Sequence, residues 1–106
     1  MRVLFACSLG LCRSAMAANV YGQQGIDTRF GGLRAEAATP LDDDDFRWAQ
    51  WVIVFEAEHV PLALSRLLRA GSAANCVYVP LEQILDPRCH AFRASLAAAA
   101  KRTAVA

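Results

Sequence analysis

Short apolar runs alternate with helical segments along the sequence, and this alternation limits the folds open to the chain. Runs typical of strands lie at residues 2–6, 26–30, 51–55 and 76–79. Segments with helical spacing or helix-end signals lie between and after them, at residues 13–23, 41–50, 59–71 and 86–101. Strands that alternate with helices predict an α/β fold, a four-stranded parallel sheet with helices on both faces and right-handed crossovers.

Two of these helices carry informative residues. The acids at 42–45 fall in a first helical turn, where the helix dipole favours them. Consecutive acids point in different directions on a helix, so a solvated helix start is favoured over a calcium or magnesium site. Gly71 is placed as the C-cap of the helix at 59–71, whose buried face is expected to hold Leu64, Leu67 and Leu68.

The bulk composition argues against several classes of protein. At 106 residues, the chain is expected to form a single domain over residues 1–106. No apolar run reaches the roughly 20 residues of a membrane span, and the first residues lack a signal-peptide pattern, so we expect a cytoplasmic protein without a membrane partner. A net charge of +1 does not indicate a basic surface that could bind a phosphate backbone, which argues against a nucleic-acid partner. The sequence leaves the oligomeric state open.

Four cysteines are present, at Cys7, Cys12, Cys76 and Cys89. Without a secretory segment, an even count does not indicate a disulfide framework. Zinc sites use closely spaced pairs, whereas Cys76 and Cys89 stand thirteen positions apart. We therefore expect no structural metal site.

The segment CSLGLCRS joins the first predicted strand to the first helix, at the edge where parallel sheets bind ligands. Successive backbone N–H groups can surround a tetrahedral oxyanion there, with the positive end of the helix behind it. Gly10 can adopt a positive φ, and the planar fork of Arg13 can hold two phosphate oxygens. The expected phosphate-binding residues are Ser8, Leu9, Gly10, Leu11, Cys12, Arg13 and Ser14.

Cys7 lies at the base of this predicted loop. The loop amides, the helix N-terminus and Arg13 all favour thiolate over thiol, so the pKa of Cys7 is expected below its ordinary value of about 8.5. Ser14 is placed to donate a further hydrogen bond, and a thiolate beneath a bound phosphorus atom is a nucleophile in attack position. A structural alternative stays open, in which Cys7 and Cys12 are small core residues and Arg13 is a surface charge.

The C-x5-R-S spacing directly after the first strand resembles the signature of the low-molecular-weight protein tyrosine phosphatases. Residues 39–59 also resemble the middle segment of the short bacterial branch of that family. The resemblance implies hydrolysis of phosphomonoesters through a cysteinyl-phosphate intermediate, without metal or cofactor. The partner would be a protein phosphorylated on tyrosine or a small phosphomonoester. By the same resemblance, Cys7 would be the nucleophile, Arg13 would bind phosphate and stabilise the transition state, and Ser14 would lower the pKa of Cys7.

The chain departs from the family pattern at three positions. Gly10 stands where the family usually has an asparagine that braces the loop, and Ala15 stands where it usually has a proline. Leu81 stands where the family has the aspartate that protonates the leaving group. Asp86, in the only Asp-Pro of the chain, is the candidate general acid, with a helix N-cap as its other interpretation. Glu82 is a further candidate for the acid.

Two alternative functions remain open. CRSAMA resembles a run in thiol-dependent arsenate reductases of the same fold, which would relay electrons through Cys76 and Cys89. The departures at Gly10 and Leu81 favour instead a degenerate domain that binds phosphate or a phosphoprotein without turnover. For Cys12, the family resemblance implies a reversible disulfide with Cys7, and packing as a small residue is the alternative.

Three polar residues follow the third predicted strand at its carboxyl end. Glu56 and Glu58 could act on the charge of a substrate, or cap the next helix, which is the favoured interpretation. His59 is expected to be a helix-end or surface histidine, because nothing in the sequence pairs it with a nucleophile.

Overall fold

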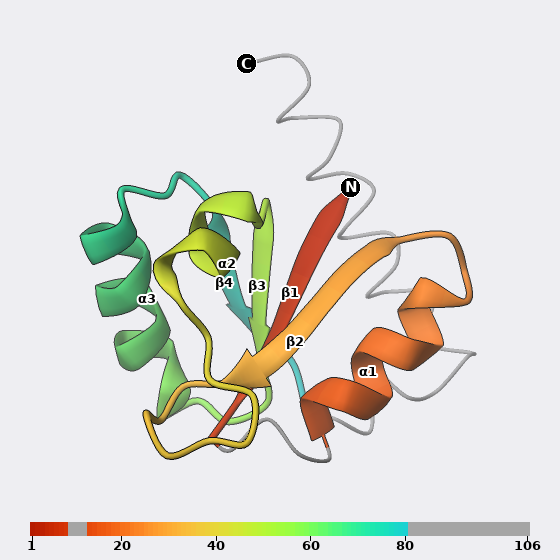
Figure 1. Ribbon diagram of the computed structural model, residues 1–106, viewed down its shortest axis with the longest axis horizontal. Helices are drawn as coiled ribbons and strands as arrows, with labels where there is room; N and C mark the ends of the chain where they lie inside the picture. The colour runs from red at the N-terminus through yellow and green to blue at the C-terminus, as the bar shows by residue number, and fades with distance from the viewer. Residues whose placement is uncertain (9–12, 81–106) are drawn as a thin grey trace.

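The computed structural model describes residues 1–8 and 13–80, apart from the side chain of Arg13. Within these ranges the elements are β1 (Arg2–Cys7), α1 (Arg13–Gly22), β2 (Asp27–Gly32), α2 (Asp43–Trp48), β3 (Trp51–Val54), α3 (His59–Ala70) and β4 (Asn75–Tyr78) (Figure 1). The predicted alternation of strands and helices is confirmed over this part of the chain. The helix expected at 86–101 lies outside the described residues.

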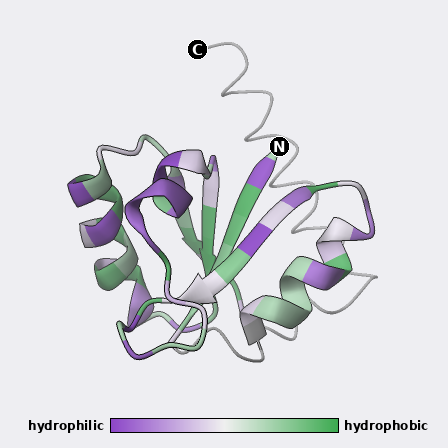
Figure 2. Ribbon diagram, in the orientation of Figure 1, coloured by the Kyte–Doolittle hydropathy of each residue, from purple (hydrophilic) through white to green (hydrophobic). Residues whose placement is uncertain are grey.

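The four strands form one parallel sheet in the order β2-β1-β3-β4. β1 lies in the interior of the sheet, where Phe5 pairs with Phe30 of β2 and with Ile53 of β3. Five of its six residues are buried, and β1 is coloured as hydrophobic along most of its length in Figure 2. The nearly continuous apolar run at residues 2–6 therefore reflects a strand covered on both faces.

Alternate residues of β1 contribute to two separate hydrophobic clusters, one on each face of the sheet. Val3, Phe5 and Cys7 pack in the cluster covered by α1. Leu4 and Ala6 pack in the cluster covered by α2 and α3. The predicted parallel sheet with helices on both faces is thus confirmed (Figure 1). Cys7 belongs to the cluster on the α1 face.

The acidic start of α2 forms a capping box. The side chain of Asp42 accepts a hydrogen bond from Asp45 N at 2.9 Å, and the side chain of Asp45 accepts one from Asp42 N at 3.0 Å. These bonds satisfy N–H groups that a helix start leaves without partners. The acids at 42–45 therefore begin a helix, as the sequence predicts.

The buried face predicted for α3 is wrong in part. Leu67 is buried, but Leu64 and Leu68 are 50% and 84% exposed. The buried residues are His59, Ala63, Leu67 and Ala70, a stripe with the spacing of one helix face. Small alanines on that stripe let α3 approach the sheet, whereas the sequence prediction followed the large leucines. The C-cap is confirmed, because Gly71 takes the left-handed conformation at φ 71°.

β2 extends further than the predicted end at residue 30, because the strand continues through Gly31 and Gly32. A side chain at Gly31 would meet the backbone oxygen of Thr39 at 2.7 Å and Leu41 Cδ2 at 2.5 Å. Glycine therefore lets the segment after β2 pack directly on the strand. Arg66 of α3 holds the same segment by donating to the carbonyl oxygens of Leu33, at 3.4 Å, and Leu41, at 2.8 Å.

None of the helices in the described ranges has both the length and the apolar character needed to cross a membrane.

Candidate active site

Cys7 is the last residue of β1 and lies at the carboxyl edge of the sheet, opposite Gly32 of β2. The segment after β2 packs against the end of β1 through the backbone. Leu33 N donates to the carbonyl oxygen of Cys7 at 2.7 Å, and Arg34 N donates to that of Ser8 at 3.2 Å. These bonds fix the backbone at the point where the sequence predicts the phosphate loop to begin.

The Cys7 thiol contacts a buried hydroxyl. Its Sγ lies 3.2 Å from Ser14 Oγ, and the two residues are 3% and 0% exposed. Ser14 occupies the first turn of α1, so the start of the helix directs this hydroxyl back to the end of β1. A hydroxyl that donates to sulfur favours the thiolate. Cys7 packs in a hydrophobic cluster, as expected if it is a small core residue. It also contacts the Ser14 hydroxyl, as expected if it is a nucleophile.

His59 lies at the same edge, as the first residue of α3. It is 8% exposed, and its Nε2 lies 3.0 Å from Ser8 Oγ and 3.7 Å from Glu56 Oε2. The expected position at a helix end is confirmed, because His59 begins α3. The alternative of a surface histidine is wrong, because His59 is buried and bonded to Ser8. The contact between His59 and Ser8 could have been predicted only from the strand order. β1 and β3 are neighbours in the sheet, so the residues that follow their carboxyl ends lie close together.

Glu56 and Glu58 form a carboxyl pair beside His59. Glu58 occupies the N-cap position of α3 but makes no side-chain capping hydrogen bond, so the capping role favoured for it is wrong. A hydrogen bond with Glu56, reinforced by the charge of that carboxylate, raises the pKa of Glu58 above its ordinary value. Single ligand atoms of Glu56, Glu58 and His59 all lie within 4.8 Å of one another. The pair adds negative charge to this edge of the sheet.

Several predicted site residues lie outside the described part of the chain. They are Leu9, Gly10, Leu11 and Cys12 of the loop, the side chain of Arg13, the candidate acids Glu82 and Asp86, and Leu81 and Cys89. The structure therefore brings together Cys7, Ser8 and Ser14 from the predicted set, and adds His59 to them.

Cys76 lies away from Cys7. It pairs with Val52 of β3, which in turn pairs with Leu4 of β1, three residues before Cys7. Cys76 also packs against the cluster on the α2 and α3 face, whereas Cys7 belongs to the α1 face. Partial burial raises the pKa of the Cys76 thiol.

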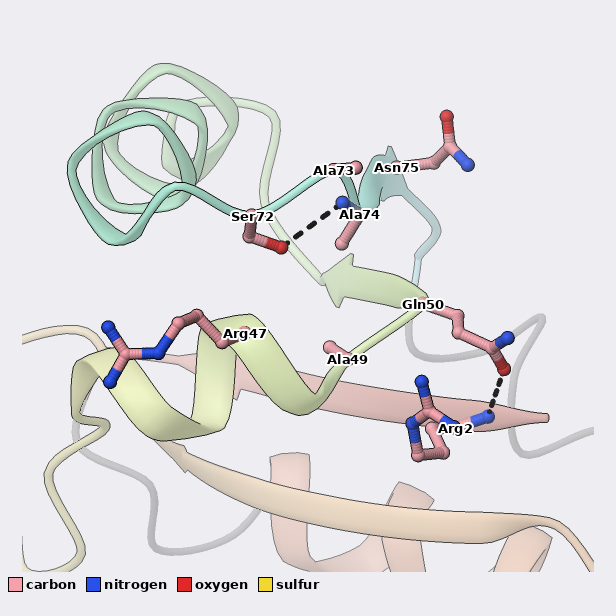
Figure 3. A pocket seen from close by; sticks show the side chains of 8 residues that line it. All are labelled: Arg2, Arg47, Ala49, Gln50, Ser72, Ala73, Ala74 and Asn75. Carbon is pink, nitrogen blue, oxygen red and sulfur yellow. Dashed lines mark hydrogen bonds between the residues drawn. The ribbon is translucent and has the colours of Figure 1, made fainter. Parts of the chain in front are cut away.

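A pocket of about 220 Å³ lies at the opposite edge of the sheet, near the start of β1. Figure 3 shows Arg2, Gln50 and Asn75 around it, with the backbone N of Arg2 donating to the Gln50 side chain at 2.8 Å. Its volume is below the roughly 300–1,000 Å³ typical of ligand pockets, and its residues lie before the strands or at their first residues rather than at their carboxyl ends. It plays no part in the site around Cys7.

The described residues thus form an all-parallel four-stranded sheet in which an interior strand ends on a cysteine before a helix, the arrangement on which the comparison with known structures rests. Solved structures with a similar fold include YwlE arginine phosphatase from Geobacillus stearothermophilus. It is 21% identical, with 80% of this chain and 69% of that chain covered and a TM-score of 0.59.

Two further structures share the fold. A YwlE arginine phosphatase mutant with a phosphorylated active-site serine is 17% identical over 74% of this chain and 68% of that chain, with a TM-score of 0.56. The solution structure of the uncharacterized protein lmo0427 is 18% identical over 91% of each chain, with a TM-score of 0.52. No protein-family model and no curated protein sequence matches the chain. At these identities the likeness concerns the fold.

Proposed function

We propose that this protein is a cysteine-dependent phosphatase of the low-molecular-weight protein tyrosine phosphatase type. The observation that carries the proposal is the 3.2 Å contact between Cys7 Sγ and Ser14 Oγ, made where an interior strand ends and a helix begins. The phosphatase-like fold supports it, as does the C-x5-R-S spacing from Cys7 to Ser14. We expect the protein to act in the cytoplasm.

In the proposed reaction, the Cys7 thiolate attacks phosphorus, forming a sulfur–phosphorus bond while the bond to the leaving oxygen breaks. A general acid, for which Asp86 is the candidate and Glu82 the alternative, gives the leaving group its proton. Water then attacks the phosphocysteine, which releases inorganic phosphate and restores the thiolate. Arg13 would hold the phosphate oxygens through both steps, and Ser14 would stabilise the thiolate.

The proposed substrate is phosphotyrosine in a protein, with phosphoarginine as the second candidate. Phosphotyrosine follows from the signature at residues 7–14. Phosphoarginine follows from the fold likeness to YwlE arginine phosphatase. The bond broken would be phosphorus–oxygen in the first case and phosphorus–nitrogen in the second. Phosphate release from two peptides that differ only in carrying phosphotyrosine or phosphoarginine distinguishes the two substrates.

The first prediction is that Cys7→Ser abolishes hydrolysis of p-nitrophenyl phosphate, because the hydroxyl of serine is a far weaker nucleophile than a thiolate. The matched control is Cys76→Ser, which changes a cysteine on the other face of the sheet and should leave turnover within about twofold. Mass spectrometry of acid-quenched wild-type protein should find phosphate on the Cys7 peptide. Full activity in the Cys7→Ser protein would exclude the mechanism.

A non-catalytic phosphate-binding domain is the second candidate function. The 3% exposure of Cys7 favours it, because catalytic cysteines are usually accessible to their substrates. In that case, phosphate would raise the melting temperature of the protein, while even p-nitrophenyl phosphate would not be hydrolysed.

The arsenate reductase alternative is disfavoured by the position of Cys76, on the opposite face of the sheet from Cys7. This alternative would be supported if the protein consumed arsenate in a reaction coupled to thioredoxin and a Cys89→Ser variant did not.

A further inference from the structure

The hydrogen bond between Ser8 and His59 joins the residue after the proposed nucleophile to the first residue of α3. His59 Nε2 lies 3.0 Å from Ser8 Oγ, and His59 is 8% exposed. Ser8 is thereby held twice, because its carbonyl oxygen also accepts from Arg34 N at 3.2 Å. The chain is thus anchored by both backbone and side chain at the residue that opens the proposed phosphate loop.

The surroundings of His59 indicate which ring nitrogen carries the hydrogen. Nδ1 is buried and has no hydrogen-bond partner among the residues that the structure describes. A buried N–H without an acceptor is more costly than a buried lone pair without a donor, so the hydrogen is assigned to Nε2. Nε2–H then donates to Ser8 Oγ, with Glu56 Oε2 at 3.7 Å from the same nitrogen.

This assignment leaves the Ser8 hydroxyl with its own hydrogen to donate. A hydroxyl has one hydrogen and two acceptor lone pairs, and His59 uses one of the lone pairs. Gly10, two residues further along the loop sequence, has no side chain with which to brace the loop. A side chain fixed at the start of the loop, such as that of Ser8, can supply bracing that Gly10 lacks.

We propose that His59 is a positioning residue that holds the Ser8 hydroxyl as a hydrogen-bond donor to a bound phosphate, and that Glu56 orients His59. The inference rests on the proposed function, since it assigns a ligand contact to the same site. His59 acts only through Ser8 and does not touch the substrate. Its loss weakens phosphate binding more than it slows the chemical step.

The second prediction compares two substitutions of His59. His59→Gln can place an amide N–H near the position of Nε2, whereas His59→Asn places one near Nδ1, out of reach of Ser8. His59→Asn and Ser8→Ala should each weaken the affinity for inorganic phosphate roughly tenfold, the worth of one hydrogen bond to a charged group. His59→Gln should stay within about threefold of the wild type, and His59→Asn in a Ser8→Ala background should add nothing.

Isothermal titration calorimetry with inorganic phosphate measures this affinity whether or not the protein turns over a substrate. KM and kcat for p-nitrophenyl phosphate are measured beside it, together with the melting temperature. The control for Ser8→Ala is Ser65→Ala, on the exposed side of α3, which should bind phosphate as the wild type does.

Equal phosphate affinity in all the variants would overturn the role of His59 while leaving the proposed phosphatase intact. The role of His59 is also overturned if His59→Gln loses as much affinity as His59→Asn, because no rescue by the matching amide would then be seen. A wild-type protein that neither binds phosphate nor hydrolyses its esters would overturn the proposed function, and this inference with it.

Discussion

At the scale of single residues, two cysteines on opposite faces of one sheet have different surroundings. Cys7 contacts the Ser14 hydroxyl at the end of β1, and Cys76 lies half-buried against the cluster under α2 and α3. Burial against apolar side chains disfavours an anion, which is why the pKa of Cys76 is raised. The chemistry proposed for this protein therefore depends on which thiol ionises.

The third prediction concerns the reaction of Cys76 with iodoacetamide. Because its pKa is raised, Cys76 in the folded protein should be alkylated several-fold more slowly at about pH 8 than the same residue in urea. Its rate should rise only at a pH above the ordinary thiol pKa. The raised pKa also affects stability, because the thiol of the unfolded protein ionises at a lower pH than the thiol of the folded protein. The contribution of Cys76 to the free energy of unfolding is therefore complete below about pH 8.5 and declines as the pH rises above it. Peptide mapping after timed alkylation of the Cys7→Ser variant gives the rates. Equal rates in folded and urea-unfolded protein would contradict the prediction.

Sequence could identify Cys7 and Ser14 as partners, because a fixed spacing across a strand-to-helix junction is a local pattern. It could not identify His59, which reaches Ser8 only through the pairing of β1 with β3. The tautomer of His59 and the carboxyl pair of Glu56 and Glu58 likewise depend on contacts that spacing does not contain.

At the scale of elements, α3 shows how small residues decide which face of a helix is buried. Ala63 and Ala70 lie on the buried stripe with Leu67, while Leu68 is 84% exposed. The sequence predicted the limits of α3 and its glycine C-cap, because these depend on local signals. It misplaced the buried face, because the closeness of a helix to a sheet depends on the tertiary packing.

The fourth prediction is that Leu67→Ala costs about 2–4 kcal/mol in the free energy of unfolding, because it removes a buried side chain from the sheet face. Leu68→Ala, one residue along the same helix, should change it by less than about 0.5 kcal/mol. Urea denaturation followed by circular dichroism measures both. A larger loss for Leu68→Ala than for Leu67→Ala would show that the face is assigned wrongly.

At the scale of the whole molecule, close packing of the segment after β2 supports the end of the sheet where the proposed site lies. Gly31 gives this segment room, and its neighbour Gly32 pairs with Cys7. Arg66 of α3 fixes the other side of the segment through its carbonyl oxygens. β1, the segment after β2, and α3 thus lie together at the carboxyl end of β1, although they are far apart in sequence.

The fifth prediction is that Gly31→Ala destabilises the protein by about 1–3 kcal/mol, because the new Cβ would press against the Thr39 carbonyl and Leu41. The control is Gly22→Ala at the end of α1, where the nearest atom to an added Cβ is Thr28 Oγ1 at 3.3 Å. It should cost less than Gly31→Ala, because the added Cβ would meet a single side-chain atom at a longer distance, and because alanine favours a helix more than glycine does. Thermal unfolding of the two variants tests the difference, and equal melting temperatures would contradict it.

The strand order also determines when a newly made chain can acquire its proposed chemistry. Ser8 and His59 lie 51 positions apart, and the pairing of β1 with β3 must form before they meet. During synthesis the reactive sulfur therefore leaves the ribosome long before the imidazole that supports its neighbour does. A nascent chain of this protein would carry the cysteine without this imidazole support until residue 59 had emerged.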